Sequence, residues 1–257
     1  MFEKIEDILN RIGSRHLAQL WQFYRDYFSN DEMCLKFLHE TLLCTPVSDG
    51  TVYHQQESDK NCFANDAGKV IYDSDLIPRR MLNAVVRLVS SARDMNRLYP
   101  GKDVYKVIFL VTCAETLQGL SGVDDKKKNM LFSFMEEYTN EDDKQFIAER
   151  FHHNDEEQIS EGDSFKQFVG VLNEYRNCAA HEGEYWNYCF NNNNNDYPVL
   201  LVLNVDLEKY SRYHKKEHCF ETRVSYQDFE AIFVRTCISF IRRYVAQKQE
   251  EKEHADA

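Results

Sequence analysis

The sequence predicts a mainly α-helical protein with a small β-hairpin before its last helix, and three observations support this fold class. Apolar side chains recur at helical spacing along most of the chain. Two short apolar runs of strand-like composition follow each other late in the sequence. Hydrophobic residues make up 43% of the 257 positions and include 17 Phe and 15 Tyr. That much apolar surface offsets the entropy lost on ordering, which excludes a disordered chain.

Residues 1–73 are expected to form an N-terminal helical extension followed by an irregular connection. A helical stripe of apolar side chains begins at the N-terminus, with a break near Gly13. A second helix is expected to follow Asn30. The periodicity then disappears at residues 45–74, among Pro, Gly, Asn and Asp residues that favour turns. The main helical domain is therefore expected to span residues 74–257.

Five helices are expected in the first part of that domain. The first begins at Pro78 and ends before Tyr99-Pro100-Gly101. The apolar run at residues 104–114 fits a buried helix or a buried strand by composition, and its length favours a helix. Two short helices are expected at residues 127–138 and 142–151. The fifth begins near Asp163, and its apolar stripe comprises Phe165, Phe168, Leu172, Tyr175 and Ala179.

The last part of the chain is expected to contain two strands and one long helix. The strands are predicted at residues 197–206 and 219–224, and they form the expected hairpin. Ser225 and Asp228 have the spacing of a helix N-terminal capping box. The helix that follows has a long apolar stripe, made of Phe229, Ile232, Phe233, Cys237, Phe240, Ile241 and Tyr244.

Charge and cysteine usage restrict the class of protein. The net charge is −12, so non-specific binding to nucleic acid is disfavoured and any RNA must meet a local basic cluster. Acidic residues dominate residues 136–163, which is typical of a solvated face. The 8 Cys are scattered, with no C-x2-C pair and no export signal, so we expect reduced thiols, no metal site and a cytoplasmic protein. No apolar stretch has the length of a membrane span.

One constellation could carry chemistry. The helix after Asp163 delivers the string Arg176-Asn177-Cys178-Ala179-Ala180-His181, an Arg followed by Asn and, four residues after that Asn, by His. This string, the hairpin behind it and the closing helix resemble the HEPN superfamily, over roughly residues 75–247. A second feature similar to that family is Cys113-Ala114-Glu115-Thr116-Leu117. The resemblance implies a HEPN-like helical bundle without a cofactor.

The resemblance also implies cleavage of RNA without a metal ion, in which the ribose 2′-OH attacks the adjacent phosphate. His181 is the expected proton-transfer residue, because an imidazole titrates near neutral pH. Arg176 is expected to hold the phosphate, and Asn177 to orient the imidazole or contact phosphate. Glu115 is either a carboxylate that supports this site or a solvent-exposed residue at a helix end. The resemblance thus implies a ribonuclease of a defence or toxin type.

The two principal residues do not share a helix face. Arg176 and His181 are five positions apart and diverge by about 140° on an ideal helix. They converge only through a bend, a helix end or a second chain, and the resemblance implies a homodimer with the two motifs facing across a two-fold axis. Basic and aromatic residues elsewhere are weaker candidates for RNA binding, namely Lys209, Arg212, Lys215, Lys216 and Tyr185.

Other interpretations of the same residues stay open. Arg176 and His181 are alternatively structural, with Arg176 paired to Glu182 or Glu184 and His181 capping the last turn. At the level of function, the main alternative is a non-catalytic HEPN protein that binds a nucleotide or a regulatory protein partner. A third is an acidic decoy that mimics nucleic acid, which rests only on residues 136–163.

Overall fold

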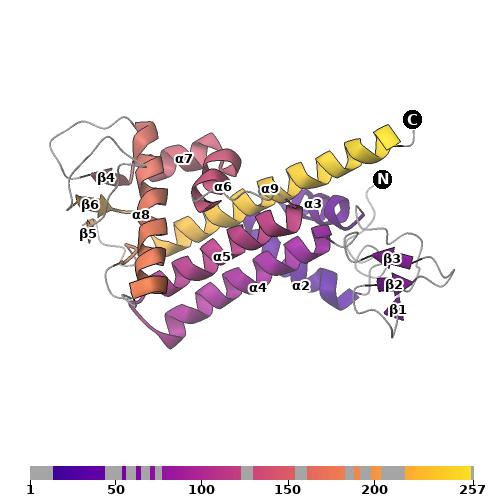
Figure 1. The fold of residues 1–257 in the computed structure, drawn as a ribbon, viewed down its shortest axis with the longest axis horizontal. Coiled ribbons are helices and arrows are strands. Elements are labelled where there is room, and N and C mark those ends of the chain that lie inside the picture. The colour runs from indigo at the N-terminus through magenta and orange to yellow at the C-terminus, as the bar shows by residue number, and fades with distance from the viewer. Residues whose placement is uncertain are drawn as a thin grey trace. The chain divides into compact units, whose positions relative to one another are not determined.

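The computed structural model describes residues 14–43, 54–55, 62–64, 70–72, 77–122, 130–153, 161–182, 188–191, 198–203 and 218–255. Within these ranges the protein is mainly α-helical, as the sequence predicts, and it contains two small antiparallel sheets (Figure 1). The chain forms two compact units. The first comprises residues 1–86, 120–122 and 238–257, and the second comprises residues 87–119 and 123–237. The expected domain boundary after residue 73 lies outside the described residues and stays a prediction.

The first unit opens with two helices that the sequence predicts. Helix α2 spans Ser14–Tyr24 and continues into a short 3-10 helix, η1, at Arg25–Tyr27. Helix α3 spans Asp31–Leu43, and the Asn30 side chain caps it by accepting a hydrogen bond of 2.9 Å from the Met33 N–H. Four apolar residues at helical spacing on α3 are buried, namely Cys34, Phe37, Leu38 and Leu42.

The turn-rich segment expected at residues 45–74 contains a sheet that the sequence did not reveal. Strands β1 (His54–Gln55), β2 (Cys62–Ala64) and β3 (Val70–Tyr72) pair in the order β1-β2-β3, all antiparallel. Each strand has only two or three residues, which is too short for an alternating pattern to be recognised.

Two long helices belong partly to each unit. Helix α4 (Ile77–Leu98) ends at the predicted Tyr99-Pro100-Gly101 stop, where Gly101 takes φ 76°. Helix α9 (Tyr226–Ala255) begins at the predicted capping box, since the Ser225 hydroxyl accepts a hydrogen bond of 3.0 Å from the Asp228 N–H. In the first unit, Tyr24 Oη donates to the Leu82 carbonyl at 3.0 Å.

The second unit is built around aromatic side chains from several helices. Helices α5 (Val104–Ser121), α6 (Met130–Tyr138), α7 (Glu141–Ala148) and α8 (Glu161–Glu182) confirm the four expected between residues 104 and 181. The run at 104–114 is thus helical and extends seven residues further. The largest fully buried rings of this unit come from α6, α8, α9, the sheet and the segment after α8, namely Tyr175, Tyr188, Phe134, Phe168, Phe229, Phe233, Phe151 and Phe220.

The hairpin is confirmed but is one part of a larger sheet. Strands β5 (Val199–Leu203) and β6 (His218–Thr222) pair antiparallel, and β4 (Phe151–His153) pairs with the other edge of β6 (Figure 1). The prediction that α7 continues through Phe151 was wrong. The helix ends at Ala148, and Phe151 instead stacks on Phe220 of β6 with ring centroids 5.2 Å apart. Strands β4 and β6 are far apart in the sequence, so local periodicity could not reveal that they pair.

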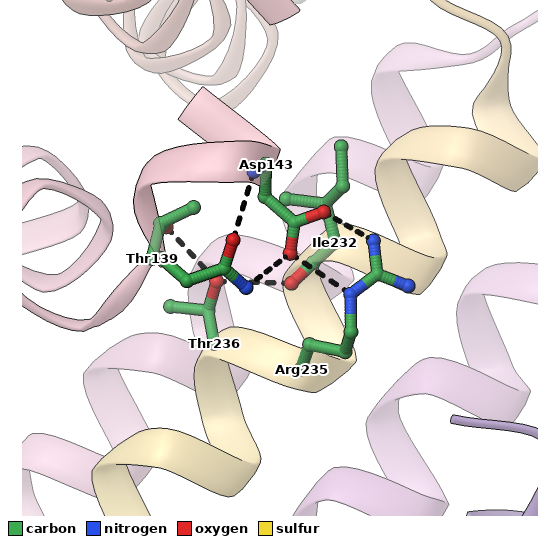
Figure 2. A network of polar contacts seen from close by, with 6 residues as sticks. Thr139, Asp143, Ile232, Arg235 and Thr236 are labelled. Atoms are coloured by element: carbon green, nitrogen blue, oxygen red, sulfur yellow. Dashed lines mark hydrogen bonds and ion pairs between the residues drawn. The ribbon is translucent and has the colours of Figure 1, made fainter. Parts of the chain in front are cut away.

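A polar network joins α7 to α9 within the second unit. Figure 2 shows Arg235 and Thr236 of α9 facing Asp143 and Thr139. Arg235 donates to both carboxylate oxygens of Asp143, and the Thr139 and Thr236 hydroxyls lie 2.9 Å apart. Among the described helices, none is both long and apolar enough to cross a membrane.

Candidate functional site

Helix α8 sets the direction of the motif residues by burying the opposite face. Tyr175 and Ala179, one helical turn apart, are 2% and 1% exposed. Arg176 and Asn177 follow Tyr175 directly and are rotated toward the surface, where both are partly exposed. The chain remains helical from Arg176 through His181, so no break in the helix brings these two residues together.

The structure places Arg176 against Glu115 of α5. Arg176 Nη2 donates to Glu115 Oε1 at 2.7 Å, and the two side chains are 26% and 35% exposed. Glu115 does not lie at a helix end, because α5 continues to Ser121. The two features that carry the resemblance, 61 residues apart in sequence, therefore meet in space. The alternative partners expected for Arg176, Glu182 and Glu184, are not needed to explain its position.

Asn177 makes a second contact with the same guanidinium. Arg176 Nη1 donates to Asn177 Oδ1 at 3.1 Å. A guanidinium has five N–H donors in a planar fork, and these two contacts use one hydrogen on each terminal nitrogen. The remaining donors of a partly exposed group can bind an oxyanion such as a phosphate or a carboxylate. The contacts restrict the rotation of the guanidinium, so it is oriented before any ligand arrives.

A buried ion pair fixes the chain after the motif helix. Lys106 Nζ lies 2.6 Å from Asp103 Oδ1, and the two side chains are 3% and 2% exposed. The other oxygen of Asp103 accepts a hydrogen bond of 2.8 Å from the Phe190 N–H. The next residue, Asn191, donates its N–H to the Val224 carbonyl at 3.0 Å. Sequence analysis missed this pair, whose only signal was an acid three positions before a lysine at the start of an apolar helix.

Two buried tyrosines contact each other next to this ion pair, namely Tyr175 of the motif helix and Tyr188. The rings of Tyr175 and Tyr188 are 4.9 Å apart. Burial raises the pKa of Tyr188 well above its ordinary value, and the Asp103 carboxylate adds to this effect. Burial likewise raises the pKa of Tyr175, with smaller contributions from Cys178 and Cys189. Both phenols are therefore neutral at physiological pH, and their rings pack in the core of this unit.

Several predicted site residues lie outside the described part of the chain. The backbone of His181 belongs to α8, but the position of its side chain is not described. The weaker candidates for RNA binding, Tyr185, Lys209, Arg212, Lys215 and Lys216, also fall outside the described residues. Arg176, Asn177 and Glu115 are thus the site residues that the structure brings together.

Among the described residues, no group of three or more His, Cys, Asp or Glu could hold a metal ion. Six cysteines within the described ranges carry free thiols, namely Cys34, Cys113, Cys178, Cys189, Cys219 and Cys237.

Comparisons of this chain with known protein families, with curated proteins and with solved structures found no match.

Proposed function

We propose that this protein is a cytoplasmic, metal-independent endoribonuclease of HEPN type, with a role in defence or as a toxin. One observation carries the proposal, namely the contact between Arg176 and Glu115. A motif of a few residues often arises by chance. Here the two motif-like segments, predicted separately, share an ion pair on a partly exposed surface, which an accidental match does not require.

In the proposed reaction the substrate is RNA, whose ribose 2′-OH is the nucleophile. The 2′ oxygen forms a bond to phosphorus as its proton passes to a base, and the bond from phosphorus to the 5′ oxygen breaks as an acid donates a proton to that oxygen. The products are a 2′,3′-cyclic phosphate and a 5′-hydroxyl end. DNA lacks the 2′-OH and is not cleaved.

Each residue has a distinct role in this proposal. His181 transfers protons, since an imidazole can accept and donate them near neutral pH. Arg176 binds the phosphate and stabilises the negative charge that grows on it during attack. Asn177 and Glu115 are positioning residues, because both hold the guanidinium at hydrogen-bond distance. Asn177 was expected to orient the imidazole or contact phosphate, and its contact with Arg176 supports the guanidinium as its target instead.

A homodimer is part of the proposal because one helix does not bring both groups to one phosphate. Residues 176 to 181 are continuously helical, so positions 176 and 181 are about 140° apart around the helix axis. In a two-fold dimer, Arg176 of one protomer and His181 of its partner can flank the same phosphate. Two guanidinium groups in one groove would also give a bound phosphate a second set of N–H donors.

The proposal is tested by incubating purified protein with single-stranded RNA in EDTA and by analysing the product ends. Arg176→Ala is expected to lower kcat/KM about 100-fold or more, and His181→Ala by a similar or larger factor. Glu115→Gln is expected to lower it about tenfold through misorientation of the guanidinium. Glu136→Gln is the matched control and should retain full activity, because it removes the same charge from another ion pair with a partly exposed lysine, Lys166.

Two outcomes would contradict the nuclease proposal. In the first, RNA stays intact with the unchanged protein and with every variant, although all of them are folded and dimeric. The non-catalytic binding function then becomes the better explanation. Cleavage could also persist in Arg176→Ala and His181→Ala, which would assign the activity to other residues or to a contaminant.

A further inference from the structure

The end of α4 and the turn after it are basic in an otherwise acidic protein. Residues 87–102 contain Arg87, Arg93, Arg97 and Lys102 against a single exposed acid, Asp94, whereas the whole chain has a net charge of −12. All of these residues belong to the second compact unit. In a protein of this net charge any RNA must meet a local basic cluster, and this segment is such a cluster within the described residues.

The arginines of this segment lie on the solvent side of α4. Val89 and Ala92 are completely buried, which defines the opposite face of the helix. Arg87 and Arg97 are exposed and are separated by about 15 Å along the helix axis. Neither guanidinium pairs with a carboxylate of the described residues, so both are available to an external anion. Arg93 is different, because it makes a bidentate ion pair with Glu230.

An exposed aromatic ring follows α4, between Arg97 and Lys102 in the chain. Tyr99 is 50% exposed, and its ring centroid lies 5.2 Å from that of Tyr105, which supports it from the protein side. The turn is held by two backbone hydrogen bonds, from the Tyr99 N–H to the Met95 carbonyl at 2.8 Å and from the Lys102 N–H to the Tyr99 carbonyl at 3.2 Å. Tyr99 is thus a fixed ring with a solvent-accessible surface, next to the exposed Lys102.

We propose that Arg87, Arg97, Lys102 and Tyr99 form a binding surface for single-stranded nucleic acid. The three cations contact phosphates, and the Tyr99 ring stacks on an unpaired base. The exposed ring favours this partner over an acidic protein, because carboxylate side chains have no flat apolar face for stacking. Phosphates and base faces are common to RNA and DNA, so the surface binds both kinds of single strand. That the bound strand is RNA in the cell rests on the proposed ribonuclease function.

The proposal is tested by measuring fluorescence anisotropy with a labelled single-stranded DNA of mixed sequence over a range of salt concentrations. DNA is used because the proposed reaction cannot cleave it. The double variant Arg87→Gln/Arg97→Gln is expected to bind more weakly and to lower the slope of log affinity against log salt by about 1.4, or about 0.7 for each phosphate contact. Tyr99→Ala is expected to weaken binding about tenfold, and Tyr99→Phe to bind like the unchanged protein.

The matched control for charge is Lys36→Gln/Lys248→Gln. It removes two exposed positive charges from helices α3 and α9 and should leave the affinity and the salt slope unchanged. Circular dichroism of every variant checks that the helices remain folded. Equal binding by all variants would overturn the proposal. The proposal would also be overturned if a labelled Glu-rich peptide bound more tightly than the DNA and if Tyr99→Ala left the binding of that peptide unchanged. That result would assign the surface to an acidic protein partner.

This experiment separates the binding surface from the nuclease proposal. If DNA binds with the expected pattern but RNA is never cleaved, the surface stands and the proposed reaction fails. If RNA is cleaved through Arg176 while the variants on α4 bind like the unchanged protein, the reaction stands and the surface fails.

Discussion

Ion pairs in this protein differ in their access to water, and this difference decides what each contributes to stability. The pair between Asp103 and Lys106 is almost fully buried, whereas the pair between Glu115 and Arg176 is about one-third exposed. A pair in contact with water contributes about 0–1 kcal/mol. The contact with Glu115 therefore orients the Arg176 guanidinium but adds little to the free energy of unfolding. Asp103 and Lys106 are buried in the folded state, so the loss of either charge would affect folding strongly.

Replacing Asp103 with Ala is expected to lower the free energy of unfolding by about 3–5 kcal/mol, because Lys106 would remain buried without its partner charge. Urea denaturation measures the change. Glu141→Ala is the control, since Glu141 and Lys144 have the same three-residue spacing at 2.7 Å but Glu141 is 86% exposed. That control should lose less than about 0.5 kcal/mol. Equal losses in both variants would contradict the argument from burial.

At the scale of elements, side chains at helix ends determine where the helices begin. Asn140 precedes α7 and accepts a hydrogen bond of 2.8 Å from the Asp143 N–H. Its amide nitrogen donates to Asp143 Oδ2 at 2.8 Å, and Arg235 of α9 binds the same carboxylate. The start of α7 is thus connected to α9 through Asp143, as Figure 2 shows for the Asp143 and Arg235 side chains.

Asn140→Ala is expected to lower the free energy of unfolding by about 1 kcal/mol, because the first turn of α7 loses its capping acceptor. Asn140→Gly should lose only a few tenths of that amount, since glycine is tolerated at this position. Chemical denaturation followed by circular dichroism distinguishes the two. A larger loss for the glycine variant than for the alanine variant would contradict the assigned capping role.

At the scale of the whole molecule, buried phenols and thiols make the free energy of unfolding depend on pH in the alkaline range. Burial raises the pKa of Tyr175, Tyr188 and Cys237 above their ordinary values, and it raises the pKa of Cys34 to about 12 with help from nearby acids. In the unfolded chain the thiols ionise near 9.0 and the phenols near 10.0. Above those values the unfolded state binds fewer protons than the folded state, so ionisation favours unfolding.

The free energy of unfolding is therefore expected to fall as the pH rises above about 9, by about 1.4 kcal/mol per pH unit for each such group. Urea denaturation between about pH 7 and pH 11 measures the slope. Tyr188→Phe should reduce the slope and cost little at neutral pH, because the Tyr188 hydroxyl makes no hydrogen bond with any described residue. A slope that is unchanged in this variant, or a flat profile in the unchanged protein, would contradict the prediction.

The sequence alone determined the helical fold class, because the side chains that must be buried on a helix recur locally and their spacing is visible in the chain. Capping at Asn30 and Ser225 and the stop after α4 are equally local. The sequence also singled out Arg176 and Asn177, which are adjacent in one helix and contact each other.

Only the tertiary structure decided the contacts between distant segments. In the structure Glu115 contacts Arg176, and the Phe190 N–H donates to Asp103. Phe151, expected in a helix, lies in a strand. The physical reason is that such contacts depend on how each helix is oriented about its own axis when its apolar face is buried. That orientation decides which of its other residues meet a neighbouring element. Periodicity shows which face a helix buries, but it does not show which residue of another element lies opposite.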